Sequence, residues 1–408
     1  MSMAKSLGFS PERLSRIDRF LQDRYVGPGR LPGVQFQLAR RGELVHHTVL
    51  GMADIERGTP LADDAVYRIY SMTKPVTCVA LMTLVEEGLI ALDDPVAKHI
   101  PAFADLAVFT AGVEPEFLTK PPARPMQVVD LMRHTSGLTY SFQNRTNVDA
   151  AYRKLDLEAF FGNLDLEGMI GTLSRLPLEF SPGEAWNYSV STDVVGYLVQ
   201  KLAGKPLGQV LQERIFGPLK MADTGFFVAE DQKARFTACY EPARGGLKLQ
   251  DDPQTSPFLG PPTLESGGGG LVSTAADYMR FAQMLLRGGE LEGARILAPM
   301  TLRLMTANHL PGGRDLTEFS RSLFSESTNA GVGYGLGMAV VFDAPKTLVP
   351  CSNGEVYWGG MASTAFWVDP AEEITAVFMT QLIPSSTYAI RRQLRTLVYG
   401  ALMEPRAG

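Results

Sequence analysis

An apolar segment at residues 75–88 is the feature that most constrains this 408-residue chain. Its sequence, P-V-T-C-V-A-L-M-T-L-V-E-E-G, is apolar on nearly every side of a helix and stops at Gly88, a residue type that commonly ends helices. A helix that is apolar all round has to be buried on most of its sides. The segment therefore predicts a central helix that the rest of the chain encloses.

Strand patterns occur near both ends of the chain. Residues 10–25 have the apolar spacing of an amphipathic helix. Residues 33–51 alternate apolar and polar side chains on both sides of an R-R-G-E turn, as in a β-hairpin. Residues 362–381 form two more strand patterns joined at D-P-A-E-E, and an amphipathic helix pattern follows over 390–402. This order favours an antiparallel sheet covered by the terminal helices over a parallel, doubly wound sheet.

The middle of the chain has a different character. Residues 89–299 alternate helical patterns with loops rich in proline and glycine, such as 121–125 and 266–270, and strand patterns are sparse there. We therefore predict an α+β fold, in which residues 1–88 and 300–408 form an α/β sandwich and residues 89–299 form an inserted, mostly helical domain. The active site is expected at the interface of the two domains.

Charge and composition narrow the possible partners. A net charge of -6 without a basic run leaves no electrostatic surface for nucleic acid or for an anionic membrane, so a small-molecule partner is expected. The three cysteines are far apart, and the histidines form no metal-binding motif, so neither a metal nor an organic cofactor is expected. The N-terminus lacks an apolar signal region, which favours a cytoplasmic location. The oligomeric state is not predicted.

Residues 70–76, Y-S-M-T-K-P-V, place a serine just before a lysine where the apolar helix begins. If Ser71 starts that helix, Lys74 lies one turn further along the same face, within reach of the serine hydroxyl. Burial disfavours the charged form of a lysine, and such a lysine can activate a serine nucleophile. The alternative is that Ser71 only caps the helix while Lys74 extends into solvent. The four-residue spacing alone does not decide between them.

Other serine-hydrolase arrangements have less support. No serine lies in the G-x-S-x-G pattern of a nucleophile elbow. His134 comes at a predicted helix end before Gly137, where it is expected to bond the last carbonyl groups and not to serve in a triad.

Five stretches considered together carry a resemblance to a known superfamily. They resemble, in order, the motifs of the serine β-lactamases and penicillin-binding proteins, and within that superfamily the chain looks most like the family VIII carboxylesterases. That family is similar in fold to class C β-lactamases, and the resemblance covers nearly the whole chain. The stretches are R-I-Y-S-M-T-K, L-M-R-H-T-S-G-L, F-S-P-G-E-A-W-N-Y-S-V-S, E-S-G-G-G-G-L-V-S-T and Y-W-G-G-M-A-S-T.

The resemblance implies catalytic roles for three residues. Ser71 falls on the family's acyl-accepting nucleophile, Lys74 on its lysine and Tyr188 on the tyrosine of its second motif. A phenol beside an ammonium is shifted toward phenolate, so Lys74 and Tyr188 can share one mobile proton. Without the resemblance, the favoured interpretation of Tyr188 is a core aromatic residue whose hydroxyl is hydrogen-bonded locally.

A second set of residues is implied to form the substrate site. Trp358, Gly359 and Gly360 fall where β-lactamases carry K-T-G, and a tryptophan there resembles the family VIII esterases. The backbone N–H groups of Ser71 and Met361 are the expected oxyanion hole. The alternative for W-G-G is a bulged strand.

Two departures from the β-lactamase pattern point to less polar substrates. Trp358 replaces a cation, and Val190 replaces the asparagine of Y-x-N, so both polar partners of a β-lactam are missing. Tyr140 is a further candidate for substrate binding. The S-G-G-G-G run at 266–270 is expected to form a tight loop near the site, the alternative being a flexible connector.

These observations predict a serine carboxylesterase that hydrolyses short-chain esters through an acyl-enzyme, with weak β-lactamase activity as a possible side reaction. The same machinery also suits a β-lactamase, a D-alanyl peptidase or an acyltransferase to an acceptor other than water. A catalytically silent scaffold is the non-enzyme alternative, and the intact set of Ser71, Lys74 and Tyr188 argues against it.

Overall fold

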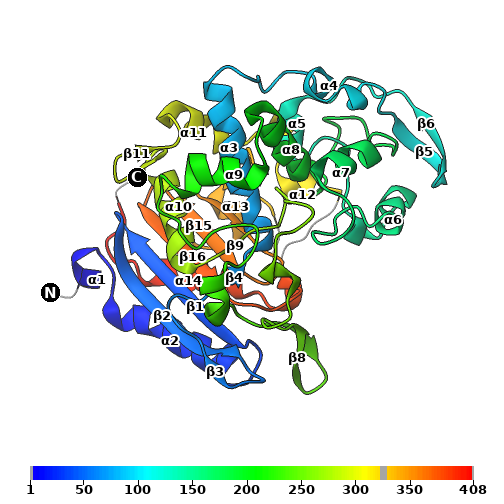
Figure 1. Cartoon of the computed structure of the whole chain (residues 1–408). Helices are drawn as coiled ribbons and strands as arrows, with labels where there is room; N and C mark the ends of the chain where they lie inside the picture. Colours follow the sequence, from blue (N-terminus) through cyan, green and yellow to red (C-terminus); the bar gives the residue numbers. More distant parts are fainter. Residues whose placement is uncertain (1–2, 322–328, 407–408) are drawn as a thin grey trace.

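The computed structural model describes residues 3–321 and 329–406. Within them, an antiparallel sheet of eight strands forms the centre of one half of the molecule (Figure 1). Strand β1, near the N-terminus, pairs with β16, near the C-terminus, so the sheet joins the two ends of the chain. In sheet order the strands are β12 (Val332–Tyr334), β13 (Ala339–Val341), β14 (Val356–Gly359), β15 (Ala365–Asp369), β16 (Ile374–Met379), β1 (Gly33–Arg40), β2 (Glu43–Asp54) and β3 (Thr59–Pro60).

Both predicted hairpins and the predicted fold class are confirmed. The first hairpin is β1–β2, with Val34 opposite Leu50 and a turn whose Gly42 has φ +83°, a conformation that favours glycine. The second is β15–β16, where D-P-A-E-E forms the connection as expected. Alternation along these strands turns successive side chains to opposite faces of the sheet.

Helices cover both faces of the sheet. On one face, α2 (Pro11–Leu21) packs against α14 (Ile390–Ala401), and Ser10 caps α2 by accepting the N–H of Arg13. Trp367 of β15 points to that side and packs on Phe36 at 6.0 Å between ring centroids. The preceding side chain, Phe366, points to the other face. It packs on Tyr278 of α10 (Ala275–Leu286) at 5.0 Å between ring centroids.

The packing of α10 differs from the predicted domain division. Its residues lie inside the range 89–299 that the sequence assigned to the helical domain, yet the helix packs on β15, β16 and β1. Its buried face, which includes Phe281 and Ala282, has the ordinary spacing of an amphipathic helix. Such spacing shows that a helix is packed, but not what it packs against.

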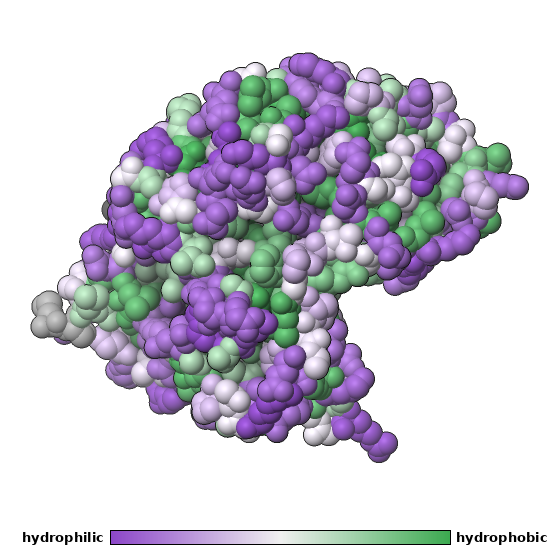
Figure 2. Space-filling model, in the orientation of Figure 1, coloured by the Kyte–Doolittle hydropathy of each residue, from purple (hydrophilic) through white to green (hydrophobic). Residues whose placement is uncertain are grey.

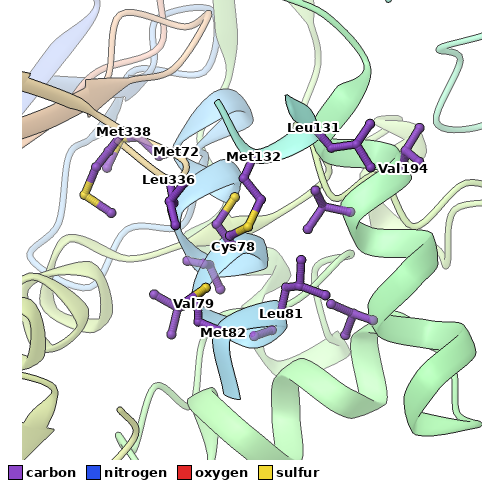
Figure 3. Close-up of a cluster of buried hydrophobic side chains, with 14 of the residues drawn as sticks. Met72, Cys78, Val79, Leu81, Met82, Leu131, Met132, Val194, Leu336 and Met338 are labelled. Carbon is purple, nitrogen blue, oxygen red and sulfur yellow. The ribbon is translucent and has the colours of Figure 1, made fainter. Parts of the chain in front are cut away.

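The predicted central helix is α3 (Thr73–Glu86). Residues 73–84 are all buried, and Figure 3 shows Met72, Cys78 and Met82 among the apolar side chains around it. The helix packs against α8 (Ser191–Ala203), and Gly88, with φ +72°, follows its end. Ser71 does not cap α3. It lies in a preceding 3-10 turn, Tyr70–Met72, and α3 begins at Thr73 without a capping side chain.

The helical part lies to one side of the sheet (Figure 1). Two hairpins within residues 89–299 were not predicted by the sparse strand patterns. β5–β6 lies in the helical part, whereas β7–β8 lies beside the sheet, where Tyr240 forms a bridge with Leu382. The bounds of these and neighbouring elements are α5 (Val128–Met132), α6 (Asn147–Lys154), α7 (Leu166–Leu173), α9 (Leu207–Leu211), β5 (Val108–Val113), β6 (Glu116–Lys120), β7 (Cys239–Ala243) and β8 (Gly246–Asp251). The remaining short elements are α1 (Met3–Ser6), α4 (Val96–His99), α11 (Pro299–Met305), α12 (Leu316–Phe319), α13 (Ala344–Thr347), β4 (Tyr67–Arg68), β9 (Val272–Ser273), β10 (Glu290–Leu291) and β11 (Ala294–Arg295).

The surface is mixed in polarity. Figure 2 shows that hydrophilic residues cover most of the visible face, with apolar residues in smaller groups between them. Among the helices of residues 3–321 and 329–406, none is both long enough and apolar enough to cross a bilayer.

Candidate active site

A cavity of about 670 Å³ lies between the sheet and the helical part, with Ser71 in its wall. Strand β14, the turn before α3 and loops of the helical part all contribute to its lining. Its volume is in the usual range for small-molecule sites. Aromatic side chains form much of the wall, among them Tyr70, Tyr140, Phe160, Trp186, Tyr188 and Trp358.

Ser71 and Lys74 lie together at this cavity. Lys74 Nζ is 3.4 Å from Ser71 Oγ and donates a 2.6 Å hydrogen bond to the carbonyl of Gly268. The alternative in which Lys74 extends into solvent is wrong, because the residue is only 1% exposed. The i, i+3 spacing across the start of α3 brings the two side chains to one face, as the sequence predicted.

Two tyrosine rings enclose the Lys74 ammonium. Nζ lies 4.4 Å from the ring centroid of Tyr188 and 5.1 Å from that of Tyr140, and the two rings are 5.2 Å apart. An ammonium near aromatic faces is stabilised by the negative ring quadrupole. Burial, followed by the nearby Asp193, raises the pKa of Tyr140 well above its ordinary value, so Tyr140 is a neutral phenol at neutral pH.

His134 lies behind this group and has no catalytic geometry. It packs on Tyr188 at 5.0 Å between ring centroids, and its Nδ1 lies 3.2 Å from Ser189 Oγ. The prediction that His134 bonds the last carbonyls of a helix is wrong, since Nδ1 lies against Ser189 and, within the described residues, Nε2 has no hydrogen-bond partner. Burial and the nearby Lys74 charge lower the pKa of His134 well below its ordinary value, so the ring is neutral.

Strand β14 and the residues after it form the wall beside Ser71. Trp358 packs on Tyr188 at 5.6 Å between ring centroids, giving an apolar surface. Gly360 approaches the backbone closely: a β-carbon there would lie 2.3 Å from the carbonyl oxygen of Ile69. Only glycine permits this approach, which fixes the end of the strand beside the segment that carries Ser71.

Met361 follows Gly360 at the rim of the cavity. Its side chain is 43% exposed and lines the cavity together with Gly359 and Gly360. Within the described part of the chain, its backbone N–H has no hydrogen-bond acceptor. An unpaired N–H at the cavity is the geometry that an oxyanion hole requires.

Val190 does not line the cavity. It is completely buried just before α8, where its N–H donates a 3.1 Å hydrogen bond to the carbonyl of Thr139. The prediction that Val190 contacts substrate is therefore corrected. The physical reason is that the chain turns into α8 at this residue, which directs the side chain into the apolar core.

The glycine-rich run at 266–270 is an ordered part of the site. Its position follows from the pairing of β4, which precedes Ser71, with β9, which follows the glycine run. The N–H of Ile69 also donates to the carbonyl of Leu271. The carbonyl of Gly267 accepts from Thr77 of α3 at 2.8 Å. The alternative of a flexible connector is wrong, because backbone groups of the run are bonded to the central helix.

Two acidic residues of the site were missed by the sequence reasoning. Asp193 accepts hydrogen bonds from Ser266 Oγ (2.5 Å) and from the N–H of Gly268 (3.0 Å). Glu158 accepts from the N–H and the hydroxyl of Ser141, and burial raises its pKa to about 7. Both carboxylates line the cavity. No sequence pattern distinguished Asp193 as a site residue, because acidic residues are common in the first turn of a helix.

The sheet, the inserted helical part and a serine beside a buried lysine at the cavity are the features of a serine hydrolase. The chain belongs to the β-lactamase family, since the family model described as Beta-lactamase matches residues 18–399.

Relatives and solved structures agree with this family. The chain is 35% identical over 359 residues to an uncharacterized protein of Mycobacterium tuberculosis, covering 87% of each chain. It is 29% identical over 390 residues to esterase EstB of Burkholderia gladioli, covering 90% of each. Its structure is similar to that of EstCE1, "a hydrolase with promiscuous acyltransferase activity", with a TM-score of 0.77 and 26% identity over 97% of this chain and 99% of that one.

Proposed function

We propose that this protein is a serine carboxylesterase that hydrolyses uncharged, short-chain carboxylic esters through an acyl-enzyme on Ser71. The observation that carries the proposal is the 3.4 Å approach of Lys74 Nζ to Ser71 Oγ at the wall of a cavity that several aromatic side chains line. The similarity to esterase EstB over 90% of both chains supports the same reaction class.

Acylation starts from the state in which Lys74 is a neutral amine. Ser71 Oγ attacks the ester carbonyl carbon and loses its proton to this amine, which becomes the ammonium, with Tyr188 sharing the transfer. The carbonyl oxygen becomes an oxyanion that the N–H groups of Ser71 and Met361 stabilise. The C–O bond to the alcohol then breaks, and the alcohol leaves with the transferred proton. The product is an ester between the substrate acyl group and Ser71.

Deacylation repeats these steps with water as the nucleophile. Lys74 and Tyr188 take a proton from the water as it attacks the acyl carbon, and the same two N–H groups hold the oxyanion. The bond to Ser71 Oγ breaks, the proton returns to Ser71, and the carboxylic acid leaves.

The wall beside the nucleophile supports neutral substrates. Trp358 stands where β-lactamases carry a lysine, and its ring packs on Tyr188. Arg391 also lines the cavity, but its guanidinium already donates to the carbonyls of Gly360 and Thr364. A substrate carboxylate placed beside Trp358 meets an apolar ring in place of a lysine and loses hydration there. An uncharged ester has no such loss.

The deciding experiment is intact-mass spectrometry of the protein mixed with aryl esters of two to six acyl carbons. We expect an adduct of the acyl mass on wild-type protein and none on S71A, together with loss of ester turnover in S71A. The matched control is S10A, which removes the serine that caps α2 and costs about 1 kcal/mol of stability, but leaves the cavity intact. Turnover in S71A above a tenth of wild type contradicts the proposal.

Transfer of the acyl group to an alcohol is a second candidate reaction. It is favoured by the similarity to EstCE1, whose description names acyltransferase activity, and by the apolar cavity wall. An alcohol that binds this wall competes with water for the same acyl-enzyme. Product analysis with an aryl ester and added alcohol separates the two, because transfer yields a new ester and hydrolysis yields only acid.

A further inference from the structure

Gly268 connects two buried charges at the active site. Its carbonyl oxygen accepts a 2.6 Å hydrogen bond from Lys74 Nζ, and its N–H donates a 3.0 Å hydrogen bond to Asp193 Oδ1. Ser266 Oγ donates a second, 2.5 Å hydrogen bond to the same carboxylate oxygen. The chain of contacts therefore runs from Asp193 through Gly268 to Lys74, and from there to Ser71 at 3.4 Å.

Neither charge has a direct ionic partner. Lys74 is 1% exposed and Asp193 is 3% exposed, and within residues 3–321 and 329–406 neither forms an ion pair at hydrogen-bond distance. A buried charge is costly unless an opposite charge or oriented dipoles balance it. Gly268 turns its N–H toward the carboxylate and its carbonyl toward the ammonium, so its dipoles favour both charges.

The site has no room for a side chain at residue 268. A β-carbon there would lie 2.5 Å from Asp193 Oδ2 and 2.8 Å from the Tyr140 hydroxyl oxygen. Glycine is required because the carboxylate and the phenol both approach its backbone closely. This packing holds Asp193 against Gly268 and explains why the contact is specific to this position.

We propose that Asp193 is a positioning residue for the serine–lysine pair: it holds the Gly268 carbonyl on the Lys74 ammonium and supplies the negative charge that balances it. The inference rests on the proposed function, in which Lys74 receives the proton of Ser71. Asp193 does not touch the reacting atoms. It favours the protonated lysine that forms as Ser71 attacks, and so lowers the barrier to acylation.

Several titratable groups surround Lys74 and Asp193, and any pH measurement has to distinguish their titrations from one another. Asp193 interacts with Lys74 of α3, with Tyr140 and with Glu158. Glu158 has a pKa near 7 and titrates in the range where such enzymes are assayed. The groups that face Lys74 are Cys78, His134, Tyr140, Glu158, Tyr188 and Asp193.

The test compares D193N with D277N and E158Q. D193N keeps the shape and one acceptor oxygen for Gly268 and Ser266, but removes the charge. D277N is the matched control: Asp277 is also buried and accepts from a backbone N–H and a threonine hydroxyl, but it does not line the cavity. E158Q identifies the part of the pH profile that belongs to Glu158.

Two measurements report on the pair. One is the pH profile of kcat/KM for an aryl butyrate, and the other is the rate at which a p-nitrophenyl phosphonate labels Ser71, followed by intact mass. We expect D193N to lower both rates at least about tenfold and to move the acidic limb of both profiles to lower pH by at least about half a unit. D277N is expected to lower the unfolding temperature without moving either limb.

The proposal is overturned if D193N loses stability as D277N does while its acidic limb stays at the wild-type pH. If D193N does not fold, D193S is used, since it removes the charge and its smaller side chain fits the space. Wild-type protein that is labelled but does not hydrolyse esters contradicts the proposed function alone, and the labelling rates then decide the role of Asp193. Wild-type protein that is neither labelled nor active contradicts both.

Discussion

Lys74 Nζ lies 4.4 Å from the ring centroid of Tyr188, so the ammonium and the aromatic ring that the motifs placed 114 positions apart are neighbours at the cavity. Both residues belong to the proton-transfer group of the proposed reaction. The first prediction concerns this pair.

We expect K74A and Y188F each to lower kcat by at least about a hundredfold, which is the usual loss when general-base assistance is removed. The measurement is steady-state kinetics with an aryl butyrate. Y334F serves as the control, because the buried Tyr334 hydroxyl has no hydrogen-bond partner among residues 3–321 and 329–406 and does not line the cavity. A near-normal rate in K74A or Y188F removes that residue from the mechanism.

Substrate preference is the second prediction. Because Trp358 offers no cation, we expect kcat/KM for an aryl butyrate to exceed that for a chromogenic cephalosporin by about a hundredfold, the loss expected for one missing hydrogen bond to a charged group. Val190 makes no contribution to this difference, since it is buried away from the cavity. Side-by-side kinetics with both substrates give the ratio, and comparable values favour a β-lactamase.

The third prediction tests the close approach of Gly360 to Ile69. We expect G360A to reduce kcat at least about tenfold, because its β-carbon would lie 2.3 Å from a backbone oxygen and would displace the strand that presents the Met361 N–H. G171A is the matched control: residue 171 lies in α7 with open space around its Cα, and alanine there is expected to stabilise the helix by about 1 kcal/mol. Unchanged turnover in G360A argues against an oxyanion hole at Met361.

A fourth prediction follows from the Glu158 carboxyl group, whose pKa is raised from 4.5 to about 7 by burial. The folded state therefore holds its proton more tightly than the unfolded state, so the free energy of unfolding falls as pH rises from about 4.5 through 7. We expect urea denaturation at pH 5 and pH 8 to show a smaller fall in E158Q than in wild type, by about 1 to 3 kcal/mol. An equal fall in both proteins means that Glu158 does not titrate in this range.

Short-range sequence patterns predicted the helices and strands that neighbouring residues determine. The central helix α3 and the two hairpins β1–β2 and β15–β16 follow from side-chain periodicity and turn residues over a few neighbouring positions. The Ser71–Lys74 pair is also local, because one turn of backbone sets its geometry. The aromatic and glycine motifs were recognised through a family resemblance and not from local patterns. The structure places Tyr188 and Trp358 of these motifs at the same cavity.

Contacts between distant segments were decided only by the tertiary structure. The side of the sheet that α10 covers, the burial of Val190 and the approach of Gly360 to Ile69 all depend on how complete elements pack, which no local pattern encodes. The link from Asp193 through Gly268 to Lys74 joins three segments of the chain, and each residue has an ordinary local explanation on its own. The sequence by itself predicted the buried helix α3 and the proximity of Ser71 to Lys74, because neighbouring residues set both. The tertiary structure decided which buried charge faces the lysine, because the fold brings the start of α8 and the glycine loop against α3.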